Sequence, residues 1–402
     1  MARRWLCLCV NSVFIVFANP LPVTRSQAAG FVLVESPMHL SRIPSGLRYY
    51  VGEAARQRRA VEDCAISVFS GWSYQEIDTP AVDYYSLFEQ GMGPEAQSSF
   101  RFVDADARLL ALRPDVTSSV ARASATLLAE TPRPLRLCYA ASVFHQQPRT
   151  QAEWRRETTQ LGCELIGAAG IAADVEPLLI VVETLNRLGL AGNYRITINN
   201  IDIFNGIADH LGLDRDSRER LRSLIDVRDT SALTELLTGL AVPEDERDLF
   251  VQVTRLSGKQ GIIEAAKKVI TNSRSNAALK SLEETWSVIS GLGLAESFEI
   301  DLGDVSSLDY YTGLLFKVYV RGSGIRVGRG GRYDGLTSRF GRAEPATGFV
   351  LDLDELTRVV RPPEFTASRP SAAAVALAED NVAAFREAMR RRAADERICL
   401  EL

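Results

Sequence analysis

Helical and strand-like patterns are mixed along the chain. Apolar residues recur at helical spacing in three segments that are predicted to be helices: 52–69, 117–128 and 173–188. Shorter segments rich in apolar residues are predicted to be strands: 74–80, 108–112, 136–144, 160–167 and 194–199. This mixture predicts an α+β fold, with a largely antiparallel sheet flanked by helices.

The pattern changes in the middle of the chain. Residues 203–289 are rich in Leu, Ala, Arg and Glu at helical spacing and lack strong strand signals, so we expect a helical insertion there. Strand patterns resume after it at 298–301, 314–320 and 347–352. The Gly-rich stretch 327–332 lies between strand patterns and is expected to be a tight turn.

The domain organisation follows from these changes. Residues 38–360 are expected to form one domain that contains the insertion. Residues 361–402 begin with a proline-rich linker and end in a short strand, 373–377, and a helix, 381–393. Two such elements bury little surface, so we expect this tail to pack on something else.

Composition narrows the function classes. The 402 residues include 46 Lys and Arg against 51 Asp and Glu, a net charge of −5, which disfavours wide nucleic-acid binding. The six cysteines form no CxxC pair, and the three histidines form no HExxH, so no metal site is expected. Neither a phosphate-binding P-loop nor a dinucleotide-binding GxGxxG motif is present, and no cofactor is expected.

Four segments carry a specific resemblance. They are Leu-Arg-Pro-Asp-Val-Thr, Gln-Leu-Gly-Cys-Glu, Leu-Asp-Tyr-Tyr-Thr-Gly and Gly-Gly-Arg-Tyr-Asp-Gly-Leu, at 112–117, 160–164, 308–313 and 330–336. In this order, with a helical insertion between the second and third, they resemble the catalytic domain of class II histidyl-tRNA synthetases over about residues 42–360. The resemblance implies the antiparallel sheet of class II aminoacyl-tRNA synthetases.

That resemblance implies a histidine-binding pocket. Asp115 stands where the family receives the α-ammonium group, Thr117 assists it, and the tyrosine pair closes on the imidazole. Carboxylates suit an ammonium group, and the imidazole nitrogens need polar partners. The implied histidine-binding residues are Asp115, Val116, Thr117, Gln160, Glu164, Tyr310 and Tyr311.

The arginines that serve ATP-dependent activation in that family are missing. The second class motif has Phe144 and His145 where the family has Phe-Arg, and the residues before the Leu-Asp-Tyr-Tyr segment are Ser306 and Ser307. In the third motif Glu355 stands where a phosphate-binding cation is expected. Guanidinium groups match the phosphate oxygens that gain charge in adenylation, so we expect no activation and assign no catalytic residues.

A synthetase-like domain with a histidine pocket and without adenylation resembles the regulatory subunits of ATP phosphoribosyltransferase. This implies a non-catalytic role in the first step of histidine biosynthesis, with L-histidine as feedback effector. The implied partners are the short-form catalytic subunit and a second copy of the chain, as a homodimer within a hetero-oligomer, without tRNA or membrane. Two alternatives are a divergent active histidyl-tRNA synthetase and an amino-acid-binding module with another partner.

The first 37 residues allow two interpretations. Their positive start and the short apolar run over 5–18 are typical of a secretory signal peptide. Alternatively, translation begins at Met38, and the preceding residues come from a misassigned start. The resemblance leaves no place for residues 1–37 and its implied partner works in the cytoplasm, so we expect the second interpretation and a cytoplasmic protein.

Overall fold

The computed structural model describes residues 8–10, 13–15, 43–146, 155–305, 310–361, 373–376, 381–394, 396 and 398–401. The chain divides into two units, 1–48 and 49–402. In the first unit, strand β1 (Leu8–Val10) pairs antiparallel with β2 (Val13–Ile15). Most of the N-terminal extension expected over 1–37, including the region around its possible cleavage point, lies outside the described residues.

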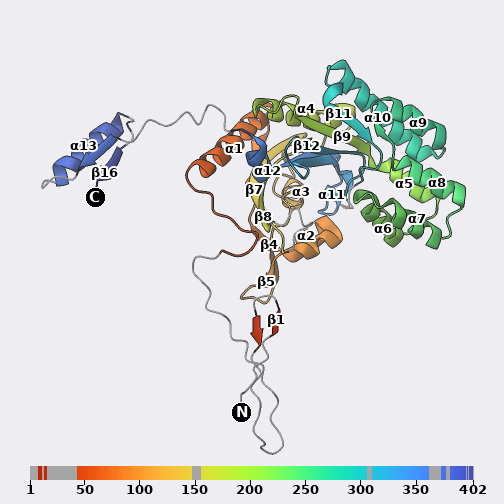
Figure 1. Ribbon diagram of the computed structural model, residues 1–402, viewed down its shortest axis with the longest axis horizontal. Coiled ribbons are helices and arrows are strands. Elements are labelled where there is room, and N and C mark those ends of the chain that lie inside the picture. The colour runs from red at the N-terminus through yellow and green to blue at the C-terminus, as the bar shows by residue number, and fades with distance from the viewer. Residues whose placement is uncertain are drawn as a thin grey trace, which may run out of the picture. The chain divides into compact units, whose positions relative to one another are not determined.

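A nine-stranded sheet forms the centre of the second unit (Figure 1). Neighbouring strands pair antiparallel except for the parallel pairs β11–β9 and β3–β7, so the predicted, largely antiparallel sheet is confirmed. The strand order is β10 (Ser257–Gly258), β11 (Phe298–Asp301), β9 (Tyr194–Asn200), β12 (Leu314–Val320), β13 (Gly328–Arg332), β14 (Ala346–Asp352), β8 (Glu157–Ile166), β7 (Leu135–Phe144) and β3 (Gln75–Glu76).

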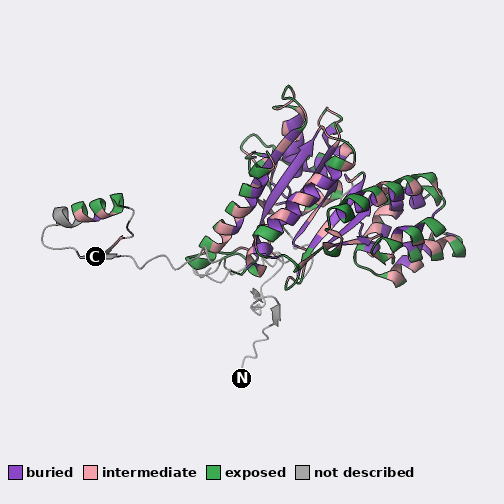
Figure 2. Ribbon diagram, turned by 90° about the horizontal axis from the view of Figure 1, so that it is seen from above, coloured by how far each residue is buried: buried purple, intermediate pink, exposed green. Residues whose placement is uncertain are grey.

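Helices cover the sheet and bury its strands, as Figure 2 shows by the purple strands between partly green helices. Helices α1 (Glu53–Gly71), α4 (Ile171–Arg187) and α10 (Ser273–Gly291) pack against the sheet through a large apolar core. In this core the Phe69 ring meets the Phe349 ring edge-on, with their centroids 5.6 Å apart. Burial of such apolar surface is the main stabilising contribution to a fold of this kind.

A second, smaller core contains Val116, Leu137 and Tyr139 together with residues of the segments around β13. Helix α3 (Thr117–Ala125) supplies part of it and contacts both α2 (Tyr85–Met92) and α11 (Asp334–Ser338). Helix α2 follows β4 (Val82–Tyr84), which pairs with β6 (Leu109–Leu112), and β6 also pairs with β5 (Arg101–Val103). The sequence patterns did not predict β4, β5 and α2, which are short.

The expected helical insertion consists of consecutive amphipathic helices. They are α5 (Ile201–His210), α6 (Arg215–Asp226), α7 (Thr230–Gly239), α8 (Glu244–Val253), α9 (Gly261–Val269) and α10. Helix α6 shows why they form: the Asp214 carboxylate accepts the Ser217 backbone N–H at 2.8 Å, and Leu221 and Ile225, one turn apart, are buried. The two-residue strand β10 interrupts the series and was not predicted.

The Gly-rich stretch is a strand, and the expected turn was therefore wrong. Strand β13 lies between β12 and β14 and pairs with both. A Cβ at Gly330 would collide with the Phe316 ring and with the Gly348 carbonyl oxygen. Glycine is therefore required here by the close approach of neighbouring strands, a use that sequence alone does not separate from a turn.

The C-terminal residues form β15 (Ala373–Ala376), α13 (Asn381–Ala393) and β16 (Ile398–Glu401). The predicted strand and helix are confirmed. Strand β16, which pairs parallel with β15, was not predicted. In the described part of the chain, no helix is long and apolar enough to cross a membrane.

Candidate functional site

Three adjacent strands of the sheet direct residues towards one site. Glu164 on β8 lies opposite Gly348 on β14, and Val350, two residues further along β14, lies opposite Arg329 on β13. Side chains alternate along a strand, so these positions share one face of the sheet. A Cβ at Gly348 would collide with the Glu164 carboxylate, so glycine at this position leaves room for that group.

Loops and a helix start complete a pocket on this face. Asp115 and Thr117 lie at the start of α3, Tyr310 and Tyr311 precede β12, and Tyr333 follows β13. The residues that line the pocket are Asp115, Thr117, Glu164, Tyr310, Tyr311, Arg329, Tyr333, Gly348, Phe349 and Val350. The structure thus brings five of the seven expected histidine-binding residues together around one cavity.

The other two expected residues lie elsewhere. Val116 does not line the pocket, because its fully buried side chain belongs to the smaller apolar core. Gln160 lines a neighbouring cavity instead. It stands four residues before Glu164 on β8, which is about 13 Å along an extended strand, so the two side chains share a face but reach different cavities.

Arg113 holds the segment that carries Asp115 in place. Its guanidinium donates to the Ser142 carbonyl oxygen at 2.7 Å, to the Thr79 carbonyl oxygen, and to the Thr79 hydroxyl at 3.2 Å. The Asp115 carboxylate in turn accepts the Ser118 backbone N–H at 3.2 Å. Charge-assisted bonds from a buried guanidinium restrict this turn, and the acidic side chain is therefore pre-positioned.

Glu164 is almost completely buried among hydroxyl groups. Tyr139 donates to one carboxylate oxygen at 3.0 Å, and Tyr333 donates to the other. Burial raises the pKa of Glu164 to about 8, because the nearby Asp115 charge adds to a desolvation effect that the bonds from Tyr333, Thr117 and Tyr139 only partly offset. The protonated form of Glu164 is therefore favoured at neutral pH.

The pocket has an aromatic side and a single cationic group. The rings of Tyr310 and Tyr311 have centroids 4.8 Å apart, and the Tyr333 ring lies edge-on to Tyr310 at 5.9 Å. Burial raises the pKa of all three phenols, so they are neutral. Arg329 is the one cation among the described residues that line this pocket.

This lining suits a small zwitterion with an aromatic ring. The carboxyl groups and phenols accept hydrogen bonds from cations, the rings pack against a flat group, and the guanidinium matches an anion. The free space is about 10 Å³, room for about one water molecule, so an amino acid enters only if a lining side chain moves.

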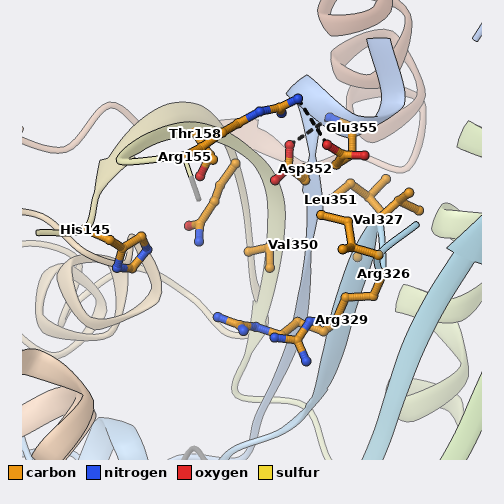
Figure 3. A pocket seen from close by; sticks show the side chains of 13 residues that line it. His145, Arg155, Thr158, Arg326, Val327, Arg329, Val350, Leu351, Asp352 and Glu355 are labelled. Carbon is orange, nitrogen blue, oxygen red and sulfur yellow. Dashed lines mark hydrogen bonds and ion pairs between the residues drawn. The ribbon is translucent and has the colours of Figure 1, made fainter. Parts of the chain in front are cut away.

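A second cavity, of about 110 Å³, lies beside the pocket and shares Arg329 and Val350 with it (Figure 3). Its lining also includes His145, Asp352 and Glu355. Burial, together with the Asp354 charge, raises the pKa of Asp352 to about 7. By the resemblance, His145 and Glu355 stand where arginines of the second and third motifs are expected.

Cations already pair with the acidic residues at the start of helix α12 (Leu353–Val359). Glu355 pairs with Arg155 at 3.1 Å and with Arg358 at 2.8 Å, and Asp354 pairs with Arg58 at 2.7 Å. A carboxylate here offers phosphate no hydrogen-bond donor, unlike the guanidinium that the resemblance leads us to expect. Ser306 and Ser307, the third replacement, lie outside the described residues.

Three residues of the site were missed by sequence reasoning: Tyr139, Arg329 and Tyr333. Tyr333 is part of the fourth motif, and that signal could have found it. Tyr139 and Arg329 depend on which strands become neighbours, which the pattern within one strand does not contain. Among the described residues, no group of three or more His, Cys, Asp or Glu side chains could hold a metal ion.

Solved structures resemble the whole fold. The closely similar architectures include an ATP phosphoribosyltransferase regulatory subunit/histidyl-tRNA synthetase from Bacillus halodurans C, with a TM-score of 0.81 at 27% identity, covering 91% of this chain and 94% of that one. The histidyl-tRNA synthetase from Nostoc sp. PCC 7120 has a TM-score of 0.71 at 19% identity, covering 90% and 86%, which shows the fold alone. The expected synthetase-like fold is therefore confirmed.

Sequence comparison is more specific. The family model described as Histidyl-tRNA synthetase matches residues 46–356. The ATP phosphoribosyltransferase regulatory subunit of Moorella thermoacetica is 35% identical over 317 residues, covering 78% of this chain and 81% of that protein. The one from Syntrophotalea carbinolica is 34% identical over 313 residues, covering 77% and 73%. The chain belongs to the ATP phosphoribosyltransferase regulatory subunit family, which shares the histidyl-tRNA synthetase fold.

Proposed function

We propose that this chain is a non-catalytic regulatory subunit of ATP phosphoribosyltransferase that binds L-histidine as a feedback effector. One observation carries the proposal: Asp115, Glu164 and the tyrosine pair line one pocket. The neighbouring cavity contains Glu355, which by the resemblance stands where a phosphate-binding cation is expected. The pocket thus suits an amino acid, whereas the resemblance implies that the arginines for its activation by ATP are missing.

The pocket chemistry fits histidine. Asp115 supplies a carboxylate for the α-ammonium group, and Thr117 lies beside it at the start of α3. The Glu164 carboxyl group, protonated or ionised, offers a partner to an imidazole nitrogen, and the adjacent rings of Tyr310 and Tyr311 offer an aromatic surface to a planar group. Val116 and Gln160 have no place in this proposal.

We expect this chain not to adenylate histidine. The transition state of adenylation spreads negative charge over phosphate oxygens, and losing one preorganised donor of that charge costs on the order of 10²–10³ in rate. The carboxylate of Glu355 is paired with Arg155 and Arg358, so this position supplies no phosphate-binding cation. The alternative of a divergent active synthetase predicts histidine-dependent exchange between ATP and pyrophosphate, and we expect none.

The catalytic step belongs, in this proposal, to a short-form catalytic subunit in the cytoplasm. A homodimer of this chain assembles with that subunit, without tRNA or a cofactor. Histidine inhibits by binding the inactive arrangement of the complex more tightly than the active one. The strength of inhibition equals that difference in binding free energy, typically about 1–3 kcal/mol. In this proposal the inactive and active arrangements of the complex differ in the position of the lining side chain that moves to admit histidine.

The test uses the full chain co-purified with the short-form catalytic subunit. We expect phosphoribosyl transfer that requires both chains and falls as histidine is added, with histidine binding seen by calorimetry. Asp115→Asn should abolish inhibition and leave assembly intact, because it removes the charge that receives the ammonium group. Asp106→Asn is the matched control, since Asp106 is exposed. Histidine-insensitive wild-type activity, or exchange of ATP with pyrophosphate, would contradict the proposal.

A further inference from the structure

Arg329 is placed unlike the other arginine of its strand. Arg332 on β13 is paired, with Nε 2.7 Å from Asp174 and a terminal nitrogen 3.0 Å from Asp334. Arg329 is only partly buried and, within the described ranges, has neither a hydrogen bond nor an ion pair. A guanidinium that faces a pocket without such a partner is available to an anionic ligand.

The guanidinium stands where three cavities meet. It lines the pocket that contains Asp115, the cavity that contains Glu355, and a third cavity beside Tyr311 and Lys317. Figure 3 shows Arg326 and Arg329 on one side of the second cavity, away from Asp352 and Glu355. The long Arg329 side chain therefore has space of about 110 Å³ next to the pocket into which it can move.

An amino-acid ligand needs such a cation. Asp115 and Glu164 suit the ammonium and imidazole groups, but neither can form an ion pair with the carboxylate of the ligand. Enclosing that carboxylate without a paired cation would be strongly unfavourable. Among the described residues that line the pocket only Arg329 can supply the pairing, and its planar fork matches both carboxylate oxygens.

We propose that the Arg329 guanidinium binds the α-carboxylate of histidine and so selects the amino acid against amines that lack this group. The inference rests on the proposed function and adds a specificity-determining residue to it. Asp115 holds the ammonium end and Arg329 the carboxylate end, while the tyrosine rings pack against the imidazole. Arg326 lines the two neighbouring cavities but not the pocket, and it takes no part.

The experiment measures binding of L-histidine and of histamine, its decarboxylated analogue, to the full chain in complex with its catalytic partner. The wild type should bind histidine far more tightly than histamine. Arg329→Met should weaken histidine binding about 100-fold, as expected for truncating one partner of an enclosed charge pair, and leave histamine within about threefold. Arg329→Lys should fall between, and Arg326→Met should match the wild type.

The outcomes separate the two proposals. No histidine binding by the wild type would overturn the proposed function. Normal histidine binding with undiminished selectivity in Arg329→Met would overturn only the inference about Arg329. Equal weakening of histidine and histamine by that variant would also overturn it, since a loss of pocket structure affects both ligands alike.

Discussion

The surroundings of Glu164 change the acidity of its carboxyl group. Its carboxyl group is 1% exposed and lies between the hydroxyl groups of Tyr139 and Tyr333. An ionised carboxylate loses its hydration there, and the donated hydrogen bonds only partly compensate, so the pKa rises to about 8. The same residue that offers a partner to a ligand therefore adds a pH dependence to the stability of the fold.

This pH dependence can be measured with Glu164→Gln. The ordinary pKa of 4.5 applies to the unfolded chain and about 8 to the folded one, so between these values the folded state binds more protons. The contribution of Glu164 to stability is therefore complete below about pH 4.5 and is lost as pH rises to about 8. Urea unfolding should show a smaller loss between these pH values in Glu164→Gln than in the wild type.

The comparison with the variant removes the effect of other titrating groups, including Asp352, because both proteins share them. Parallel stability curves for the two proteins would show that Glu164 is not protonated in the folded state. The variant retains an amide of similar shape, so the contacts with both tyrosines can be kept.

At the scale of elements, the start of α12 joins distant parts of the chain. Asp352 caps the helix by accepting the Glu355 backbone N–H at 2.9 Å. Asp354 accepts from Arg58 of α1 at 2.7 Å and from the Thr159 backbone N–H of β8 at 2.9 Å. Acidic groups also suit the positive end of the helix dipole. The residues at the start of α12 therefore connect this helix to α1 and β8.

Glu355→Ala tests whether the ion pair with Arg155 stabilises the fold. The Arg155 and Glu355 side chains are 13% and 7% exposed, so removing the carboxylate leaves a largely buried guanidinium without this partner. We expect a loss of about 3 kcal/mol in the free energy of unfolding, measured by chemical denaturation. Glu235→Ala, at an exposed position in α7, is the control and should change stability by less than about 0.5 kcal/mol.

A loss in Glu355→Ala no larger than in the control would mean that the carboxylate is not a structural partner of Arg155. The double variant Arg155→Met with Glu355→Ala should recover part of the lost stability, because it removes the buried charge as well. This recovery separates a charge effect from a general disturbance of α12.

At the scale of the whole molecule, the balance of charges bears on whether the chain can bind a polyanion such as tRNA. The net charge of −5 comes from 46 basic and 51 acidic residues, and many arginines are used in ion pairs within the chain. Attraction to a polyanion depends on cations that are free to contact its phosphates. We therefore expect the chain to bind tRNA weakly, in line with the proposed function.

We expect tRNA binding weaker than about 10 µM at about 150 mM salt, measured by gel shift or fluorescence anisotropy with histidine tRNA. An active histidyl-tRNA synthetase serves as the positive control under the same conditions. Tight binding by this chain that persists at this salt concentration would favour the alternative of a divergent synthetase.

Local patterns were sufficient for much of the architecture. The helices over 52–69 and 173–188 and the strands around 136–144 and 314–320 were predicted, because their apolar periodicity is a property of consecutive residues. Motif order also indicated the synthetase-like fold and five residues that now line one pocket. Short elements such as β4 and α2 were not predicted, since they contain too few residues for a period to be recognised.

The sequence by itself determined the fold class and the helical insertion, because these follow from periodicity and motif order. The resemblance added the expectation that the motif arginines are missing. Only the tertiary structure decided that Gln160 belongs to a different cavity from Glu164, that the Gly-rich stretch is an inner strand, and that Arg329 and Asp115 line the same pocket. Those facts depend on strand neighbours and register, which join residues far apart in the chain and are set by packing of the whole sheet.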